Sequence, residues 1–128
     1  MVYSIILWLR FDIIKEKRLI SSYDEINDTF AGKIDGEHGY CKDYGISNGV
    51  YLGINNQHFP SYILVSNASE VFNISKQVLE NPNVKIHISC NGMFLYFSIC
   101  IEDLMIFSTE CENKFGIPFL DFVFDSNY

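Results

Sequence analysis

The clearest pattern along the chain is an alternation of apolar and polar residues in Val84–Cys90. A period of two is that of a strand with one buried and one solvent-exposed face. Asn91 and Gly92 follow, the dipeptide most typical of a tight hairpin. The next apolar run, Met93–Ile101, is therefore predicted to return antiparallel, and Leu104–Phe107 is predicted to complete a three-strand meander.

Further strands are predicted on both sides of this meander. Val2–Ile14 is almost continuously apolar, which is typical of a central strand covered on both faces. Val50–Ile54 and Tyr62–Ser66 are short β-prone runs around a polar loop, a pattern that predicts an antiparallel hairpin. Phe119–Phe124 predicts the last strand, with Leu120, Phe122 and Phe124 on one face and Asp121 and Asp125 on the other.

Two spacings typical of a capping box predict helices. Ser22 and Glu25 begin the first, a short helix whose apolar residues recur at helical intervals. Asn67 and Glu70 begin the second, and the apolar residues of Val71–Leu79 follow the i, i+3, i+4, i+7 periodicity of an amphipathic helix. The Asn-Pro pair after Glu80 supplies its stop, because proline cannot continue the hydrogen-bond ladder.

The segment from Gly32 to Gly49 is rich in glycine, acidic residues, Ser and Asn. This composition predicts a long irregular loop, and such loops often carry function. Taken together, the elements predict one domain over residues 1–128. Its predicted fold class is α+β, with a mainly antiparallel sheet of about six to seven strands and two helices packed on it.

Charge narrows the classes of partner. The chain has 16 acidic and 9 basic residues, a formal net charge of -7, and from Ile86 onward only Lys114 is basic. A field of this sign repels phosphate backbones and anionic lipid surfaces and favours basic partners. We therefore expect neither direct nucleic-acid binding nor membrane binding.

The chain shows no pattern of export or membrane insertion. Met1–Leu9 is apolar but lacks the positive start of a signal peptide, and no run of about 18 uncharged apolar residues occurs. We expect a cytoplasmic protein, and in that reducing compartment four free thiols. The cysteines, which lack the spacing of a metal site, are Cys41, Cys90, Cys100 and Cys111.

Candidate chemistry is concentrated in the glycine-rich loop. Glu37, His38 and Cys41 could supply an acid-base pair or an activated nucleophile. Neighbouring loop residues usually point apart, and no catalytic signature surrounds them, so we expect no enzyme and keep a small hydrolase as an alternative. The other two histidines, His58 and His87, fall in a turn and on the polar face of a strand. We predict no metal and no cofactor.

Acidic residues in loops and turns remain as the candidate binding surface. Carboxylates on a rigid domain can imitate phosphate spacing, speed association and pair with the Lys and Arg residues of a nuclease cleft. The predicted partner-binding residues are Asp24, Glu25 and Asp28 on the first predicted helix, Asp35, Glu37, His38, Tyr40 and Asp43 in the long loop, and Glu102, Asp103, Glu110 and Glu112 near the carboxyl end.

In length, β-first element order, aromatic- and Asn-rich strands and acidic balance, the chain resembles the small acidic immunity proteins of contact-dependent inhibition and other polymorphic toxin systems. The resemblance concerns whole-chain traits, and no residue of that family is carried over. It implies a heterodimer with one cognate toxin domain, whose active site or substrate access is blocked. The net charge of -7 adds the expectation that this domain is basic and nuclease-like. A phage or mobile-element inhibitor of a host nucleic-acid enzyme, acting by the same electrostatic imitation, is the alternative.

Overall fold

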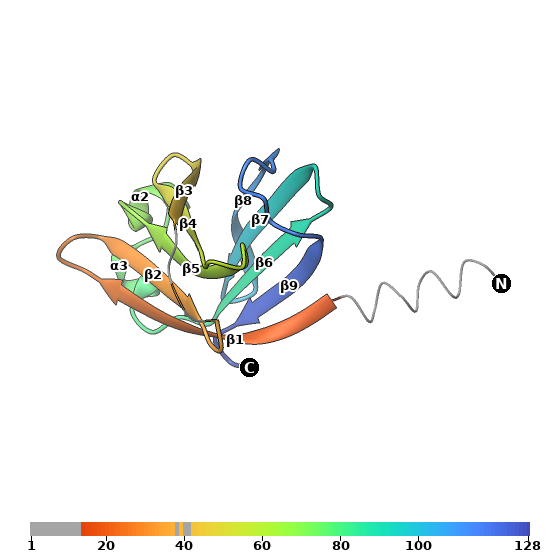
Figure 1. The fold of residues 1–128 in the computed structure, drawn as a ribbon. Helices are drawn as coiled ribbons and strands as arrows, with labels where there is room; N and C mark the ends of the chain where they lie inside the picture. The colour runs from red at the N-terminus through yellow and green to blue at the C-terminus, as the bar shows by residue number, and fades with distance from the viewer. Residues whose placement is uncertain (1–13, 38, 40–41) are drawn as a thin grey trace.

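The computed structural model describes residues 14–37, 39 and 42–128, and these are mostly strand (Figure 1). The strands are β1 (Ile14–Asp24), β2 (Thr29–Ile34), β3 (Lys42–Ser47), β4 (Val50–Ile54), β5 (Pro60–Val65), β6 (Val84–Cys90), β7 (Phe94–Ile101), β8 (Leu104–Glu112) and β9 (Leu120–Asp125), and the helices are α2 (Ala68–Phe72) and α3 (Lys76–Leu79). The described strands form one sheet in the order β3-β4-β5-β2-β1-β9-β6-β7-β8.

Strand β1 joins the two halves of this sheet. Its residues Ile14–Arg18 pair in parallel with β9, and Leu19–Asp24 pair antiparallel with β2. Figure 1 shows β1 along the base of both halves, with β2 to β5 on one side and β6 to β9 on the other. The sheet curves until its edge strands β3 and β8 come into contact, which gives a nearly closed barrel.

The core lies on the concave side of the curved sheet. Alternate residues of each strand point inward, and large side chains such as Phe30, Phe97 and Phe124 are fully buried. The helices add Phe72 and Leu79 to this core, and the ring of Phe72 packs edge-on against Phe30 at 6.2 Å. Burial of these apolar residues is the main source of stability.

The predicted α+β class is wrong, because the described residues contain more strands and much less helix than expected. The first predicted helix is the end of β1 and a turn. The side chain of Asp24 accepts hydrogen bonds from the amides of Ile26 and Asn27 at 3.0 and 3.2 Å. This Asx turn leads into β2, so the residues after Ser22 form a hairpin instead of a helix.

The second predicted helix is broken into α2 and α3. Asn73 adopts a left-handed conformation with φ of 53°, and Ser75 is extended. Asparagine enters this region more easily than other non-glycine residues, so it ends α2 after five residues. Neither described helix has the length to cross a bilayer.

The long loop predicted between Gly32 and Gly49 is also largely wrong, since it contains the end of β2 and all of β3. Most of the predicted first strand lies outside the described residues. The hairpin beginning at Val50–Ile54 and the strand Val84–Cys90 are confirmed, as is the meander through β7 and β8. Strong alternation and tight turns were therefore the reliable signals.

Candidate functional site

The acidic residues predicted near the first turn have structural contacts. Asp28 accepts hydrogen bonds from the Tyr23 hydroxyl at 2.6 Å and from the Ser69 hydroxyl and amide at 2.6 and 3.0 Å. Burial opposes ionisation of Asp28, yet the bonds from Ser69 and Tyr23 outweigh it and lower the pKa of the carboxyl. Asp24 closes the turn, and hydrogen bonds from Asn27 lower its pKa. Glu25 is exposed.

Of the predicted site residues in the β2–β3 region, some have structural contacts and others are exposed. The carboxylate of Glu37 contacts the Lys17 ammonium and accepts a hydrogen bond from Asn55 Nδ2 at 3.1 Å, and its side chain is 15% exposed. Asp43 accepts a hydrogen bond from the Tyr62 hydroxyl at 2.6 Å. Asp35 is exposed. His38, Tyr40 and Cys41 lie outside the described residues.

The predicted residues near the carboxyl end occupy both ends of β8. Glu102 accepts hydrogen bonds from the amide and side chain of Asn83 at 2.9 and 3.2 Å, and Asp103 lies 3.8 Å from Lys85. Glu110 and Glu112 are exposed at the other end. The predicted carboxylates thus do not form one surface, and several of them accept hydrogen bonds that stabilise turns.

The outer face of β9, β6, β7 and β8 brings acidic and aromatic side chains together. Glu110 is opposite Tyr96, Tyr96 is opposite Ser89, and Ser89 is opposite Asp121. Residues directly opposite on paired strands share a face, so these four cross the sheet in one row. Beside the row, Glu112 is opposite Phe94, whose side chain is 43% exposed.

His87 lies in the neighbouring row, two residues before Ser89 on β6, and contacts two members of the first row. Its Nε2 lies 2.5 Å from Asp121 Oδ1, and its ring packs edge-on against Tyr96 at 5.6 Å. We call Phe94, Tyr96, Glu110, Glu112, Asp121 and His87 the acidic-aromatic face. Sequence reasoning placed His87 on a polar strand face correctly and identified both glutamates. It missed Asp121 as a functional candidate, although alternation in Phe119–Phe124 put that residue on the outer side.

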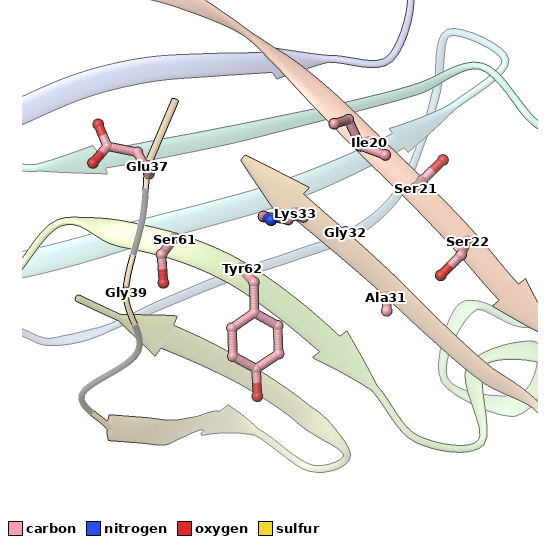
Figure 2. A pocket seen from close by; sticks show the side chains of 10 residues that line it. All are labelled: Ile20, Ser21, Ser22, Ala31, Gly32, Lys33, Glu37, Gly39, Ser61 and Tyr62. Carbon is pink, nitrogen blue, oxygen red and sulfur yellow. The ribbon is translucent and has the colours of Figure 1, made fainter. Parts of the chain in front are cut away.

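A groove of about 500 Å³ lies on the outer face of the other half, over β1, β2 and β5 (Figure 2). Ile20 and Ser22 on β1 form one wall, and Tyr62 on β5 forms the other. Between them, Ala31 leaves the surface hollow because its side chain is small. Among the described lining residues, Lys33 and Glu37 are the charged ones, and we call this hollow the Lys33 groove. Sequence reasoning did not find it, since no motif marks it.

Two described groups that the sequence offers for acid-base chemistry already have partners. Glu37 is held by Lys17 and Asn55, and His58 Nδ1 lies 3.2 Å from the carbonyl oxygen of Phe115. Cys90, Cys100 and Cys111 are free thiols, as predicted, and desolvation raises the pKa of Cys111. In the described ranges no three His, Cys, Asp or Glu residues lie close enough to hold a metal.

Comparisons of the chain with protein-family models, curated proteins and solved structures gave no match.

Proposed function

We propose that this chain is an immunity-type protein that binds a basic, nuclease-like toxin domain and neutralises it by blocking its active site or substrate access. The observation that carries the proposal is the acidic-aromatic face. On one side of the sheet, Glu110 and Glu112 lie directly opposite Tyr96 and Phe94, and Asp121 lies on the other side of Tyr96, beyond Ser89. Three strand spacings separate the ends of its row, a span of about 15 Å.

This combination of side chains suits arginine and lysine. A guanidinium group stacks on an aromatic ring and pairs with a carboxylate through two parallel hydrogen bonds. Clefts that bind nucleic acid present such cations to neutralise phosphates. Carboxylates on the acidic-aromatic face would occupy the same cations, and a net charge of -7 would speed the encounter.

The face is also rigid before any partner arrives. Ile88, Phe97 and Phe124 pack beneath its strands and are fully buried, so the backbone that carries the acidic groups is fixed. Contacts of His87 with Asp121 and Tyr96 restrict two of the face's side chains. Side chains that are already ordered lose less conformational entropy on binding, which favours a tight complex.

The test is affinity capture from native cell lysate at low and moderate salt, followed by nuclease assays of the captured protein. The wild type is compared with Glu110→Gln/Glu112→Gln and with a control of equal charge change, Glu25→Gln/Glu70→Gln. We expect the wild type and the control to capture one basic toxin domain at equal stoichiometry and to inhibit it. The face variant should bind at least about tenfold more weakly at low salt, and the difference should shrink as salt increases.

Other outcomes discriminate among the alternatives. Loss of binding only in Glu25→Gln/Glu70→Gln would move the interface to the β1–β2 turn and α2. Capture of a host nucleic-acid enzyme instead of a toxin would support the mobile-element inhibitor. A captured protein whose activity is unchanged by the complex would overturn the proposed function.

A further inference from the structure

We propose that the Lys33 groove binds a small amphipathic carboxylate, with the anionic group on Lys33 and an apolar or aromatic body over Ala31 between Ile20 and Tyr62. This site lies on the opposite half of the sheet from the acidic-aromatic face and is independent of the proposed function. Among the described lining residues, the apolar surface of Ile20, Ala31 and Tyr62 and the charge of Lys33 point to this class of ligand, as does the size of the groove.

The wall formed by Tyr62 is fixed by two contacts. A Cβ atom on Gly53 would lie 2.1 Å from Cδ1 of Tyr62, so the ring lies flat across the backbone of β4 where a side chain is missing. The Tyr62 hydroxyl donates a hydrogen bond to Asp43 at 2.6 Å. Figure 2 shows the ring extending from β5 beside the groove. The aromatic surface is therefore preformed.

The opposite wall, formed by Ile20 and Ser22, and the floor at Ala31 are mostly apolar and open. Lys33 is opposite Ile20 on one side and opposite Tyr62 on the other, so these three side chains share a row. Ile20 is 48% exposed, so its side chain is available to the apolar part of a ligand. In the next row the small side chain of Ala31 leaves room for the body of a ligand.

Charge selects an anion. Lys33 is exposed, and none of the ion pairs among the described residues includes it. Glu37 also lines the groove, but its carboxylate is already bound by Lys17 and Asn55. Among the described residues that line the groove, Lys33 thus carries a positive charge with no ion-pair partner, in a chain whose net charge is -7. An ammonium on a flexible stem can pair with a carboxylate at several positions.

The size of the groove agrees with a small organic ligand. Its volume of about 500 Å³ lies within the usual range of about 300–1,000 Å³ for small-molecule sites. The groove is open along one side, so we expect a dissociation constant in the upper micromolar range for a simple probe.

Naphthoate is the probe, with neutral naphthamide and cationic naphthylmethylamine as matched compounds, titrated into the full chain by calorimetry and by NMR. We expect naphthoate to bind and the amine not to bind. Naphthamide should bind at least about fivefold more weakly than naphthoate. Lys33→Gln should weaken naphthoate binding about fivefold, whereas Lys42→Gln, an exposed lysine outside the groove, should leave it unchanged.

Steric tests complete the design. Ala31→Leu should abolish binding by filling the floor, and Ile20→Glu should abolish it by placing a negative charge on an already exposed wall position that tolerates substitution. Ile20→Glu decides the result if Ala31→Leu does not fold. The proposal is overturned if naphthoate fails to bind, if the three compounds bind equally, or if Lys33→Gln or Ile20→Glu binds like the wild type.

Discussion

Substitution Asp28→Asn tests how the β1–β2 turn is attached to α2. Asp28 has a positive φ of 50°, a conformation that asparagine also tolerates, so the backbone can stay in place. The carboxylate accepts hydrogen bonds from Tyr23 and from the hydroxyl and amide of Ser69. Asparagine has only one acceptor oxygen, so one of these bonds is lost and the rest lose the assistance of the charge.

The magnitude follows from these contacts. Hydrogen bonds to charged groups contribute about 1.5–3 kcal/mol each and neutral ones about 0.5–1.5 kcal/mol, so a half-buried site should lose about 2 kcal/mol. For a chain of 128 residues, an unfolding entropy of about 0.27 kcal/mol/K makes this a decrease in Tm of about 7 °C. Asp35→Asn, at an exposed turn position, is the control and should change Tm by less than about 2 °C.

The pH dependence provides a second readout. The folded-state pKa of Asp28 is lowered by its hydrogen bonds, so its stabilisation is complete above the ordinary aspartate pKa and is lost as pH falls through the folded value. The Tm difference between wild type and Asp28→Asn should therefore be largest near neutral pH and smallest in acid. Thermal denaturation followed by circular dichroism measures it. Equal effects of Asp28→Asn and Asp35→Asn at neutral pH would refute the anchoring role.

Two further substitutions test the packing of the sheet. Gly53→Ala should lower the free energy of unfolding by about 1–3 kcal/mol, because the new Cβ overlaps the ring of Tyr62. Urea denaturation measures this change, and an unchanged midpoint would contradict the close approach of the ring to Gly53. Phe97→Ala should lower it by about 3–5 kcal/mol by opening a cavity in the core, whereas Phe119→Ala, at a side chain that is 63% exposed, should lower it by less than about 1 kcal/mol. Similar losses for the two phenylalanines would show that the assigned core is wrong.

The predictions from sequence were right where local pattern and turn chemistry agreed and wrong where tertiary pairing overrode local pattern. Val84–Cys90 alternates strictly and is β6. Ser22 and Glu25 have the spacing of a capping box, yet the neighbouring Asp24 binds two turn amides, and pairing with β2 holds Tyr23 in a strand. Pairing between distant segments cannot be deduced from a local window, so the helix was predicted wrongly.

At the candidate site, the sequence predicted which face of the sheet a residue lies on but not which residue lies opposite it. Asn91 was predicted within the hairpin turn, but its amide donates a hydrogen bond to the carbonyl oxygen of Phe94. Its side-chain oxygen accepts hydrogen bonds from the amides of Met93 and Phe94. The turn residues are therefore Gly92 and Met93, and Cys90 pairs with Leu95. A two-residue shift keeps every side chain on its predicted face but changes its neighbour. Outer-face residues could thus be predicted, whereas the row through Tyr96 could not.

The shared strand β1 has a consequence for biosynthesis. Its parallel partner, Asp121–Asp125, is synthesised more than a hundred residues after Ile14–Arg18. During translation, β2 to β5 can assemble on β1 early, but β6 to β8 must wait for β9 to connect them to it. Contacts of such long sequence separation form slowly because the intervening chain must be ordered first. The acidic-aromatic face, which includes Asp121, is accordingly completed late, after the ribosome has synthesised β9.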